Sequence, residues 1–290
     1  MAKQKQQPRL KKSMLRHSTL FFALLFIFSL LLALTLFGVG FIFVPTDSGE
    51  ATSITSIVRK TVVRENEGGG DEEDGRERWT EVLSWEPRAF VYHNFLTKAE
   101  CEHLIDISKP HMQKSFVVDP KTGLPRASSA RTSYGWFLRK GQDAFIRNIE
   151  KRIADLTFIP VENGESIQIL RYETGQEYKF HHDYFSDKFS VQRGGQRVAT
   201  VLIYLSDVEE GGETVFPRAK GDFSSVSRRN NSSVCAGTGL AVKPRMGDAL
   251  LFWSMKPDGT PDPNSLHGGC PVINGTKWSA TKWLRMSEYI

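Results

Sequence analysis

The segment YKFHHDYFSD, residues 178–187, holds two adjacent histidines followed directly by an aspartate. If this segment is a β-strand, alternate side chains share a face, so His181 and Asp183 point one way and His182 the other. An imidazole and a carboxylate on one face suit a first-row metal ion. We therefore expect His181 and Asp183 to bind a metal, and His182 to be structural or to face a substrate.

A third ligand is available downstream at His267, in the run NSLHGGCPVINGTKW. Taken alone, this residue would be an ordinary half-buried histidine. Together with His181 and Asp183 it completes a 2-His-1-carboxylate triad, which is typical of non-haem Fe(II) with open positions for oxygen. Lys277 follows ten residues later. A lysine inside a barrel needs an anion partner, and without one it faces solvent.

Two helices and a series of short strands must position these residues. Thr97 and Glu100 form a capping-box pattern, which predicts a helix that ends before Pro110. Residues 141–157 carry apolar side chains at helical spacing. Strands are expected at residues 89–95, 166–173, 177–185, 197–206, 212–217, 240–253, 267–273 and 277–286. The pattern predicts an α+β, mainly β fold, a jelly-roll barrel supported by the two helices.

The N-terminal part has a different organisation. Residues 18–46 are mostly apolar and uncharged, and they are long enough to cross a bilayer as a helix. Residues 1–17 carry six basic and no acidic side chains, so this tail is expected in the cytosol and the remainder in the lumen. Residues 47–78 are polar and are expected to be a disordered stem, followed by one domain at 79–290. The alternative is a cleaved signal peptide, whose apolar core would be shorter.

The net charge of +5 follows from this topology. Without the six basic residues of the tail, 32 basic residues stand against 33 acidic ones. The basic balance is therefore no argument for nucleic acid, and we expect none as a partner. Cys101 shares a helix face with Leu104 and is expected to be a free, buried thiol. Glycosylation sequons begin at Asn230, Asn231 and Asn274, and the last lies in an expected tight turn.

These residues carry a resemblance to a known family. An H-x-D motif, a distant histidine and a lysine ten residues after it resemble the 2-oxoglutarate- and Fe(II)-dependent dioxygenases. The chain is most similar to the plant-type prolyl 4-hydroxylases. The resemblance covers most of residues 80–285 and rests on these runs: SWEPRAFVYHNFLTKAECEHLI, RTSYGWFL, LRYETGQEYKFHHDYF, VLIYLSDVEEGGETVFP, GDALLFW and SLHGGCPVINGTKWSATKW. It implies a double-stranded β-helix as the form of the jelly roll.

The resemblance also implies roles for single residues. His181, Asp183 and His267 would bind iron, and Lys277 would pair with the distal carboxylate of 2-oxoglutarate. Tyr172 would hydrogen-bond near that carboxylate, and Trp283 would pack beside the cosubstrate. The positions that match peptide contacts are Arg131, Tyr178 and Arg197. Arg285 departs from the family pattern, in which some members have histidine at this position.

The activity implied is peptidyl-proline 4-hydroxylation of proline-rich secreted or cell-wall proteins, with oxidative decarboxylation of 2-oxoglutarate to succinate and CO₂. Fe(II), 2-oxoglutarate, O₂ and ascorbate are the implied cofactors. The resemblance further suggests that Cys235 and Cys270 pair, which would hold the 218–240 loop close to His267. Residues 186–197, which are polar and contain Gly194-Gly195, are expected to be either a lid over the peptide or a plain mobile loop.

Other functions stay open at this point. The same chemistry could act on lysine or on a small molecule. The topology also fits a membrane-anchored glycosyltransferase, but no D-x-D motif follows the stem. A non-catalytic binding module would not need His181, Asp183, His267 and Lys277 together. We expect a single-pass type II protein of the endoplasmic reticulum or Golgi membrane, with the association with other prolyl hydroxylases left open.

Overall fold

The computed structural model describes residues 76–119, 122, 124–126, 128–221 and 233–290. The expected tail, anchor and most of the expected stem therefore lie outside the described residues. Of the stem, only residues 76–78 are described, and they have no regular secondary structure. No helix in the described ranges combines the length and the apolar character needed to cross a bilayer.

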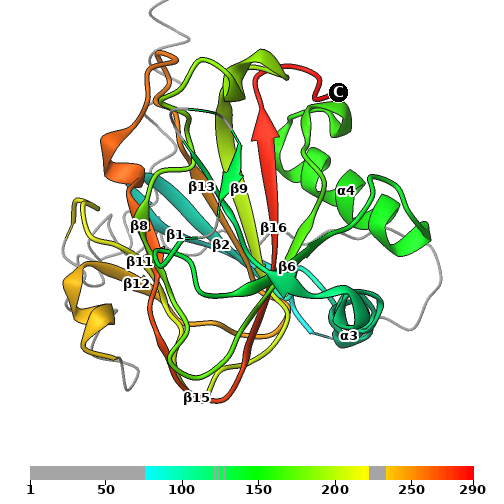
Figure 1. Ribbon diagram of the computed structural model, residues 1–290, viewed down its shortest axis with the longest axis vertical. Coiled ribbons are helices and arrows are strands. Elements are labelled where there is room, and N and C mark those ends of the chain that lie inside the picture. The colour runs from blue at the N-terminus through cyan, green and yellow to red at the C-terminus, as the bar shows by residue number, and fades with distance from the viewer. Residues whose placement is uncertain (1–75, 120–121, 123, 127, 222–232) are drawn as a thin grey trace, which may run out of the picture. The chain divides into compact units, whose positions relative to one another are not determined.

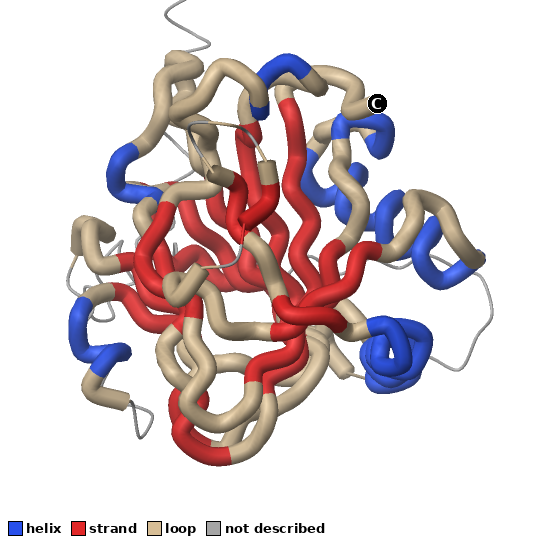
Figure 2. Tube along the Cα trace, viewed as in Figure 1, coloured by secondary structure: helices blue, strands red, loops and turns tan. Residues whose placement is uncertain are grey.

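Most of the described chain is β-structure (Figures 1 and 2). The first strands are β1 (Trp79–Trp85), β2 (Arg88–His93), β3 (Gln113–Lys114), β4 (Val117–Val118), β5 (Pro125–Arg126), β6 (Tyr134–Phe137), β7 (Gln168–Tyr172) and β8 (Tyr178–His181). The later strands are β9 (Arg197–Tyr204), β10 (Glu210–Gly211), β11 (Thr214–Phe216), β12 (Leu240–Val242), β13 (Ala249–Trp253), β14 (His267–Gly269), β15 (Val272–Asn274) and β16 (Lys277–Arg285).

Two sheets form the scaffold of the jelly roll. The larger sheet has the order β1-β2-β13-β9-β16-β7-β6-β3, and the smaller one has the order β12-β11-β14-β8. Two further pairs, β10 with β15 and β4 with β5, complete the strands. Neighbouring strands run antiparallel throughout the two sheets. The mainly β prediction and the jelly-roll prediction agree with this arrangement.

Two α-helices lie beside the larger sheet: α3 (Lys98–Ser108) and α4 (Ala144–Thr157) (Figure 1). The capping box of Thr97 and Glu100 is present, and α3 ends before Pro110 as predicted. Short 3-10 turns occur at η1 (Lys109–His111), η2 (Val161–Asn163), η3 (Ser190–Gln192), η4 (Cys235–Thr238) and η5 (Pro263–Ser265). The buried face of α4 carries Ile146, Ile149 and Ile153, whereas Phe145 is 44% exposed. Phe145 stacks on His103 of α3 instead of entering the core.

The side chains of strand β16 alternate between the main apolar core and a cavity on the opposite side of the sheet. Ala280 and Leu284 face the main apolar core, which contains the buried isoleucines of α4. Lys282 points to the same side and forms an ion pair of 2.6 Å with Glu150 of α4. The odd-numbered residues Lys277–Trp283 point to the opposite side and line a cavity. Apolar packing is thus concentrated against the helices, where Lys282 is neutralised by Glu150, and the polar side chains of Lys277, Ser279 and Thr281 lie between the two sheets.

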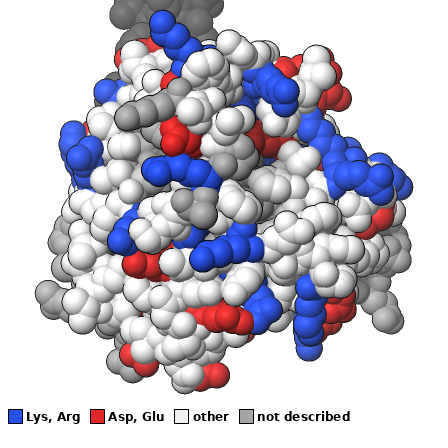
Figure 3. Space-filling model, viewed as in Figure 1, with Lys and Arg blue, Asp and Glu red and all other residues white. Residues whose placement is uncertain are grey.

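The free thiol of Cys101 is buried, as predicted. Burial raises the pKa of this thiol to about 12. On the face shown in Figure 3, lysine, arginine, aspartate and glutamate side chains are dispersed among uncharged surface. This mixed distribution agrees with the 27 basic and 24 acidic residues in the range 79–290.

Candidate active site

The expected metal ligands come together between the two sheets. His181 ends β8 and His267 begins β14, and these two residues are direct partners in the antiparallel ladder. Asp183 lies two residues beyond the end of β8 and is buried. One ligand atom from each of the three residues lies within 4.8 Å of the others. The three side chains therefore form one compact donor set.

The strand prediction for residues 177–185 was wrong at its C-terminal end. β8 stops at His181, and residues 183–184 form a bend. Alternation along a strand therefore does not place Asp183 beside His181; the bend turns the carboxylate inward. His182 faces away from the triad, with its Nε2 atom 3.3 Å from the carbonyl oxygen of Pro263 and its ring 4.5 Å from that of Tyr184.

Hydrogen bonds fix which nitrogen of each histidine faces the centre. The Nδ1 atom of His181 lies 2.8 Å from the carbonyl oxygen of Lys179, and the Nδ1 atom of His267 lies 2.9 Å from that of Ser265. A carbonyl can only accept, so each Nδ1 carries the proton and each Nε2 has a free lone pair. Both Nε2 atoms lie 3.6 Å from an oxygen of Asp183. Two unprotonated imidazole nitrogens and a carboxylate fit a divalent first-row metal such as Fe(II).

Charge and burial keep this donor set in the form that binds metal. Burial raises the pKa of Asp183, but the imidazoles of His267 and His181 outweigh burial and hold that pKa below its ordinary value. Burial lowers the pKa of His267 to about 4, although Asp183 acts in the opposite direction. The carboxylate is therefore ionised and His267 is neutral at neutral pH.

Thr200 takes part in the site and Glu165 supports it from outside the cavity, and sequence reasoning missed both. The hydroxyl of Thr200 on β9 donates to Asp183 Oδ2 at 2.6 Å. The carboxylate of Glu165 accepts from both Arg197, at 2.6 and 2.8 Å, and Arg285, at 2.6 Å. A single threonine in an apolar strand and a single glutamate after a turn carry no local motif, so only the fold identifies them.

Lys277 lies at the end of the same cavity, with its Cα in register with that of Tyr172 on the neighbouring strand β7. Its side chain is buried, and the ammonium lies 5.5 Å from the ring centres of Tyr172 and Tyr204. The ammonium donates to the carbonyl oxygen of Gly212 at 2.6 Å. The structure thus brings Lys277 and Tyr172 to the cavity of the triad.

Several buried polar atoms that line this cavity have no hydrogen-bond partner in the described part of the chain. They are the Nε1 atom of Trp283, the Oγ atom of Ser279 and the Nε atom of Arg131. Buried polar groups are nearly always satisfied, so unpaired atoms call for a ligand or water. The cavity therefore offers hydrogen-bond donors to a small polar molecule beside the triad.

The residues expected to contact a peptide lie in two different settings. Arg131 is buried, donates to Gln168 at 2.9 Å, and lies 4.7 Å from the ring centre of Tyr178. Tyr178 stacks on His181 at 3.7 Å. Arg197 is held by Glu165, and its guanidinium covers the ring of Trp283 at 3.9 Å. Arg131 and Tyr178 thus line the cavity, whereas Arg197 supports Trp283.

Cys235 and Cys270 form a disulfide with a Cα–Cα distance of 5.8 Å. Asn274 is exposed at the end of β15, directly before the positive φ of Gly275, and its amide donates to Glu209. Asn230 and Asn231 lie outside the described residues.

Comparison with known proteins gives consistent matches. Residues 167–285 match the model of the 2OG-Fe(II) oxygenase superfamily. The chain is 59% identical over 286 residues to "probable prolyl 4-hydroxylase 10" of Arabidopsis thaliana, covering 98% of this chain and 96% of that protein. It is 58% identical over 243 residues to "prolyl 4-hydroxylase 5" of the same plant, covering 84% and 82%. The solved structure of a viral collagen prolyl hydroxylase from Paramecium bursaria Chlorella virus-1, in complex with 2OG, matches with a TM-score of 0.50 and 28% identity, covering 68% of this chain and 95% of that one.

Proposed function

Because the chain belongs to the plant-type prolyl 4-hydroxylases, within the 2-oxoglutarate- and Fe(II)-dependent dioxygenases, we propose that it hydroxylates peptidyl proline at C4 in proline-rich secreted proteins. The observation that carries this proposal is the single cavity that contains His181, Asp183, His267 and Lys277. The names of the relatives support proline as the target and 2-oxoglutarate as the cosubstrate.

In this proposal the triad holds Fe(II) through the two Nε2 atoms and the carboxylate. When bound, the metal and 2-oxoglutarate supply the oxidising chemistry, in which O₂ gives one oxygen atom to the proline and one to succinate, with release of CO₂. Ascorbate serves to keep the iron reduced. The protein itself binds, orients and excludes water, and no protein side chain needs to be consumed.

The other cavity residues position the organic molecules. Lys277 offers a charged donor to the distal carboxylate of 2-oxoglutarate, with the phenol of Tyr172 nearby. The unpaired indole N–H of Trp283 and hydroxyl of Ser279 face the same space and can donate to a bound anion. Arg131 and Tyr178 lie at the β8 side of the cavity and are assigned to the peptide, and Arg197 keeps the ring of Trp283 in place.

The cellular setting is inferred from the sequence and the disulfide. We assign residues 18–46 to a single membrane anchor, with the catalytic domain in the lumen of the endoplasmic reticulum or Golgi. The Cys235–Cys270 disulfide supports this assignment because disulfides persist in oxidising compartments. The exposed side chain of Asn274 is accessible for a glycan, and the same role is proposed for Asn230 or Asn231.

The test is a product analysis with the purified full-length protein. It is incubated with Fe(II), 2-oxoglutarate, ascorbate and a panel of proline-rich peptides, and each peptide has a partner in which alanine replaces proline. The proposal predicts succinate release that depends on proline and one added oxygen on the proline ring. Oxygen added to lysine, or succinate release that is equal with alanine peptides, would contradict it.

A further inference from the structure

Lys277 is a buried cation in the described part of the chain without a carboxylate in ion-pair contact. The phenols of Tyr172 on β7 and Tyr204 on β9 lie beside its ammonium. Glu213, in the connection between β10 and β11, directly follows Gly212, whose carbonyl oxygen accepts a hydrogen bond from that ammonium. Asp183, His267 and Arg131 line the same cavity further along. Burial lowers the pKa of Lys277 to about 8, and Glu213 is the charged group that opposes this shift.

Glu213 is itself buried, with an exposed fraction of 3%. Both of its carboxylate oxygens accept hydrogen bonds from Ser233, at 3.0 Å from the backbone N–H and at 2.8 Å from the hydroxyl. Its backbone carbonyl accepts from the N–H of Cys270 at 2.8 Å. The side chain and the backbone of Glu213 are therefore both fixed, and the adjacent carbonyl of Gly212 holds the Lys277 ammonium.

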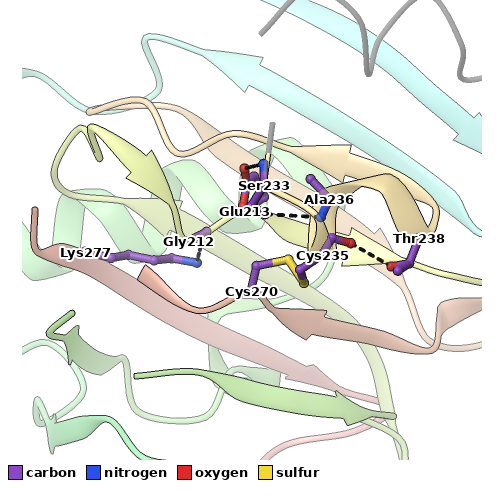
Figure 4. The surroundings of a disulfide bond; sticks show 8 residues. All are labelled: Gly212, Glu213, Ser233, Cys235, Ala236, Thr238, Cys270 and Lys277. Atoms are coloured by element: carbon purple, nitrogen blue, oxygen red, sulfur yellow. Dashed lines mark hydrogen bonds between the residues drawn. A yellow bond between two sulfur atoms is a disulfide. The ribbon is translucent and has the colours of Figure 1, made fainter. Parts of the chain in front are cut away.

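The Cys235–Cys270 disulfide joins the two segments that hold Glu213, one through Ser233 and the other through the N–H of Cys270. Cys235 begins η4 two residues after Ser233, and Cys270 directly follows β14. The Ser233 hydroxyl also accepts from the N–H of Ala236 at 3.2 Å, so the turn that carries Cys235 orients the hydroxyl toward Glu213. Figure 4 shows this cluster, with the Lys277 side chain extending to Gly212 and the disulfide beside it.

We propose that Glu213 is a positioning residue for Lys277: Ser233 and the Cys235–Cys270 disulfide hold Glu213 next to the Gly212 carbonyl, where it supports the lysine ammonium that receives the distal carboxylate of 2-oxoglutarate. This inference rests on the proposed function, in which Lys277 binds that carboxylate. No motif in the chain assigns a role to Glu213 or Ser233, and neither residue touches the triad.

The contacts of Glu213 indicate whether its charge strengthens or weakens the binding of 2-oxoglutarate. The Glu213 carboxylate would repel an incoming carboxylate, but its charge is spread over two hydrogen bonds on the side of Ser233. A charged lysine forms a hydrogen bond to a carboxylate that is about twice as strong as a neutral one. Near the pKa of Lys277, keeping the proton on the lysine therefore outweighs the repulsion, whereas at lower pH the lysine is charged in any case.

Equilibrium binding of 2-oxoglutarate separates a change in the charge of Lys277 from a general loss of folding. Calorimetric titration of 2-oxoglutarate into the Zn(II)-loaded full-length protein, which does not turn over, gives the Kd at each pH. Glu213→Gln removes the charge and keeps the shape, Glu210→Gln is the matched control on the exposed strand β10, and Lys277→Ala gives the limit without the ammonium. The disulfide is intact in all three variants.

The wild type should bind 2-oxoglutarate with a Kd that rises as the pH passes through about 8. For Glu213→Gln the Kd should match the wild type within about twofold near pH 6.5 and be weaker by about threefold or more near pH 8, because one unit of pKa changes the charged fraction by up to tenfold. Glu210→Gln should follow the wild type at every pH. The same weakening near pH 8 is expected for Cys235→Ser/Cys270→Ser.

The results test the role of Glu213, the role of the disulfide and the proposed function separately. If the wild type binds and Glu213→Gln shows the wild-type pH dependence, or is weaker by the same factor at every pH, the role of Glu213 is refuted. If Glu213→Gln shows the shift and the double cysteine variant, folded by circular dichroism, does not, the disulfide has no part in holding Glu213. If the Zn(II)-loaded wild type does not bind 2-oxoglutarate at all, the proposed function fails and not merely this extension of it.

Discussion

At the scale of single residues, the two adjacent histidines differ in the direction of their rings. His181 points its Nε2 atom at Asp183, whereas His182 lies outside the triad and contacts the carbonyl of Pro263. We expect His181→Ala to reduce succinate formation by about a hundredfold or more, because loss of a ligand exceeds the effect of losing an outer-shell partner. His182→Ala should keep most of the activity. Equal losses in the two variants would contradict the assignment.

Thr200 is the residue whose effect should appear in metal affinity. Its hydroxyl orients the Asp183 carboxylate, and partners of this kind change affinity by about 10–100-fold. Thr200→Val keeps the volume of the side chain and should weaken Fe(II) binding by about that factor. Thr238→Val, in the exposed turn η4, is the control and should bind Fe(II) normally. An anaerobic metal titration with unchanged affinity in Thr200→Val would show that Asp183 is oriented by other contacts.

At the scale of elements, Arg285 ties the end of β16 to the 186–197 segment. Its guanidinium donates to Glu165 and to the carbonyls of Ser190, at 2.9 Å, and Gly195, at 2.7 Å. The residue that departs from the family pattern therefore fastens the segment that was expected to be a lid or a mobile loop. In this structure the segment is held at two carbonyls, which argues against a plain mobile loop, and a lid over the peptide stays a prediction.

Removing this attachment should loosen the segment without unfolding the sheets. In Arg285→Ala, we expect amide hydrogen exchange in residues 186–197 to become about tenfold faster, because local opening no longer breaks these bonds. Arg285→Lys should give an intermediate rate, since an ammonium cannot reproduce the forked donors of the guanidinium. Exchange in β7 serves as the internal reference. Unchanged exchange in 186–197 would show that the segment is held by other contacts.

The elements also show what the sequence could and could not predict. The capping box of Thr97 and Glu100 predicted the start of α3, because both residues of this signal lie within one short stretch of sequence. The end of β8 was missed because the Asp183 carboxylate is held by Thr200, which comes from another strand and leaves no local pattern. The pairing of Glu165 with Arg197 and Arg285 was also missed, since contacts over 32 and 120 residues leave no local pattern.

At the scale of the whole molecule, His93 joins three strands at one end of the larger sheet. Its Nδ1 atom lies 2.8 Å from Asp248 beside β13, and its Nε2 atom lies 3.3 Å from Glu81 on β1. Burial lowers the pKa of His93, but the hydrogen bonds and charges of Asp248 and Glu81 outweigh burial and raise it to about 9. The charged imidazole therefore stabilises the fold.

The pH dependence of the stability follows from the raised pKa of His93. A group with a raised pKa in the folded state stabilises fully below its unfolded pKa, about 6.5, and the contribution is lost as the pH rises through about 9. The difference in free energy of unfolding between the wild type and His93→Gln should thus shrink by about 3 kcal/mol from pH 6 to pH 9.5. Urea denaturation at both pH values measures it, and a constant difference would mean that His93 is not charged in the fold.

The donor set of His181, Asp183 and His267 between the two sheets is the part of the molecule on which the proposed proline hydroxylation depends. The most direct measurement is the ratio of 4-hydroxyproline to succinate formed from a proline-rich peptide by the full-length protein and by Asp183→Ala, with folding of the variant checked by circular dichroism. The wild type should form equal amounts of the two products, and Asp183→Ala should form neither product above background. Hydroxyproline formation by folded Asp183→Ala at the wild-type rate would contradict this dependence.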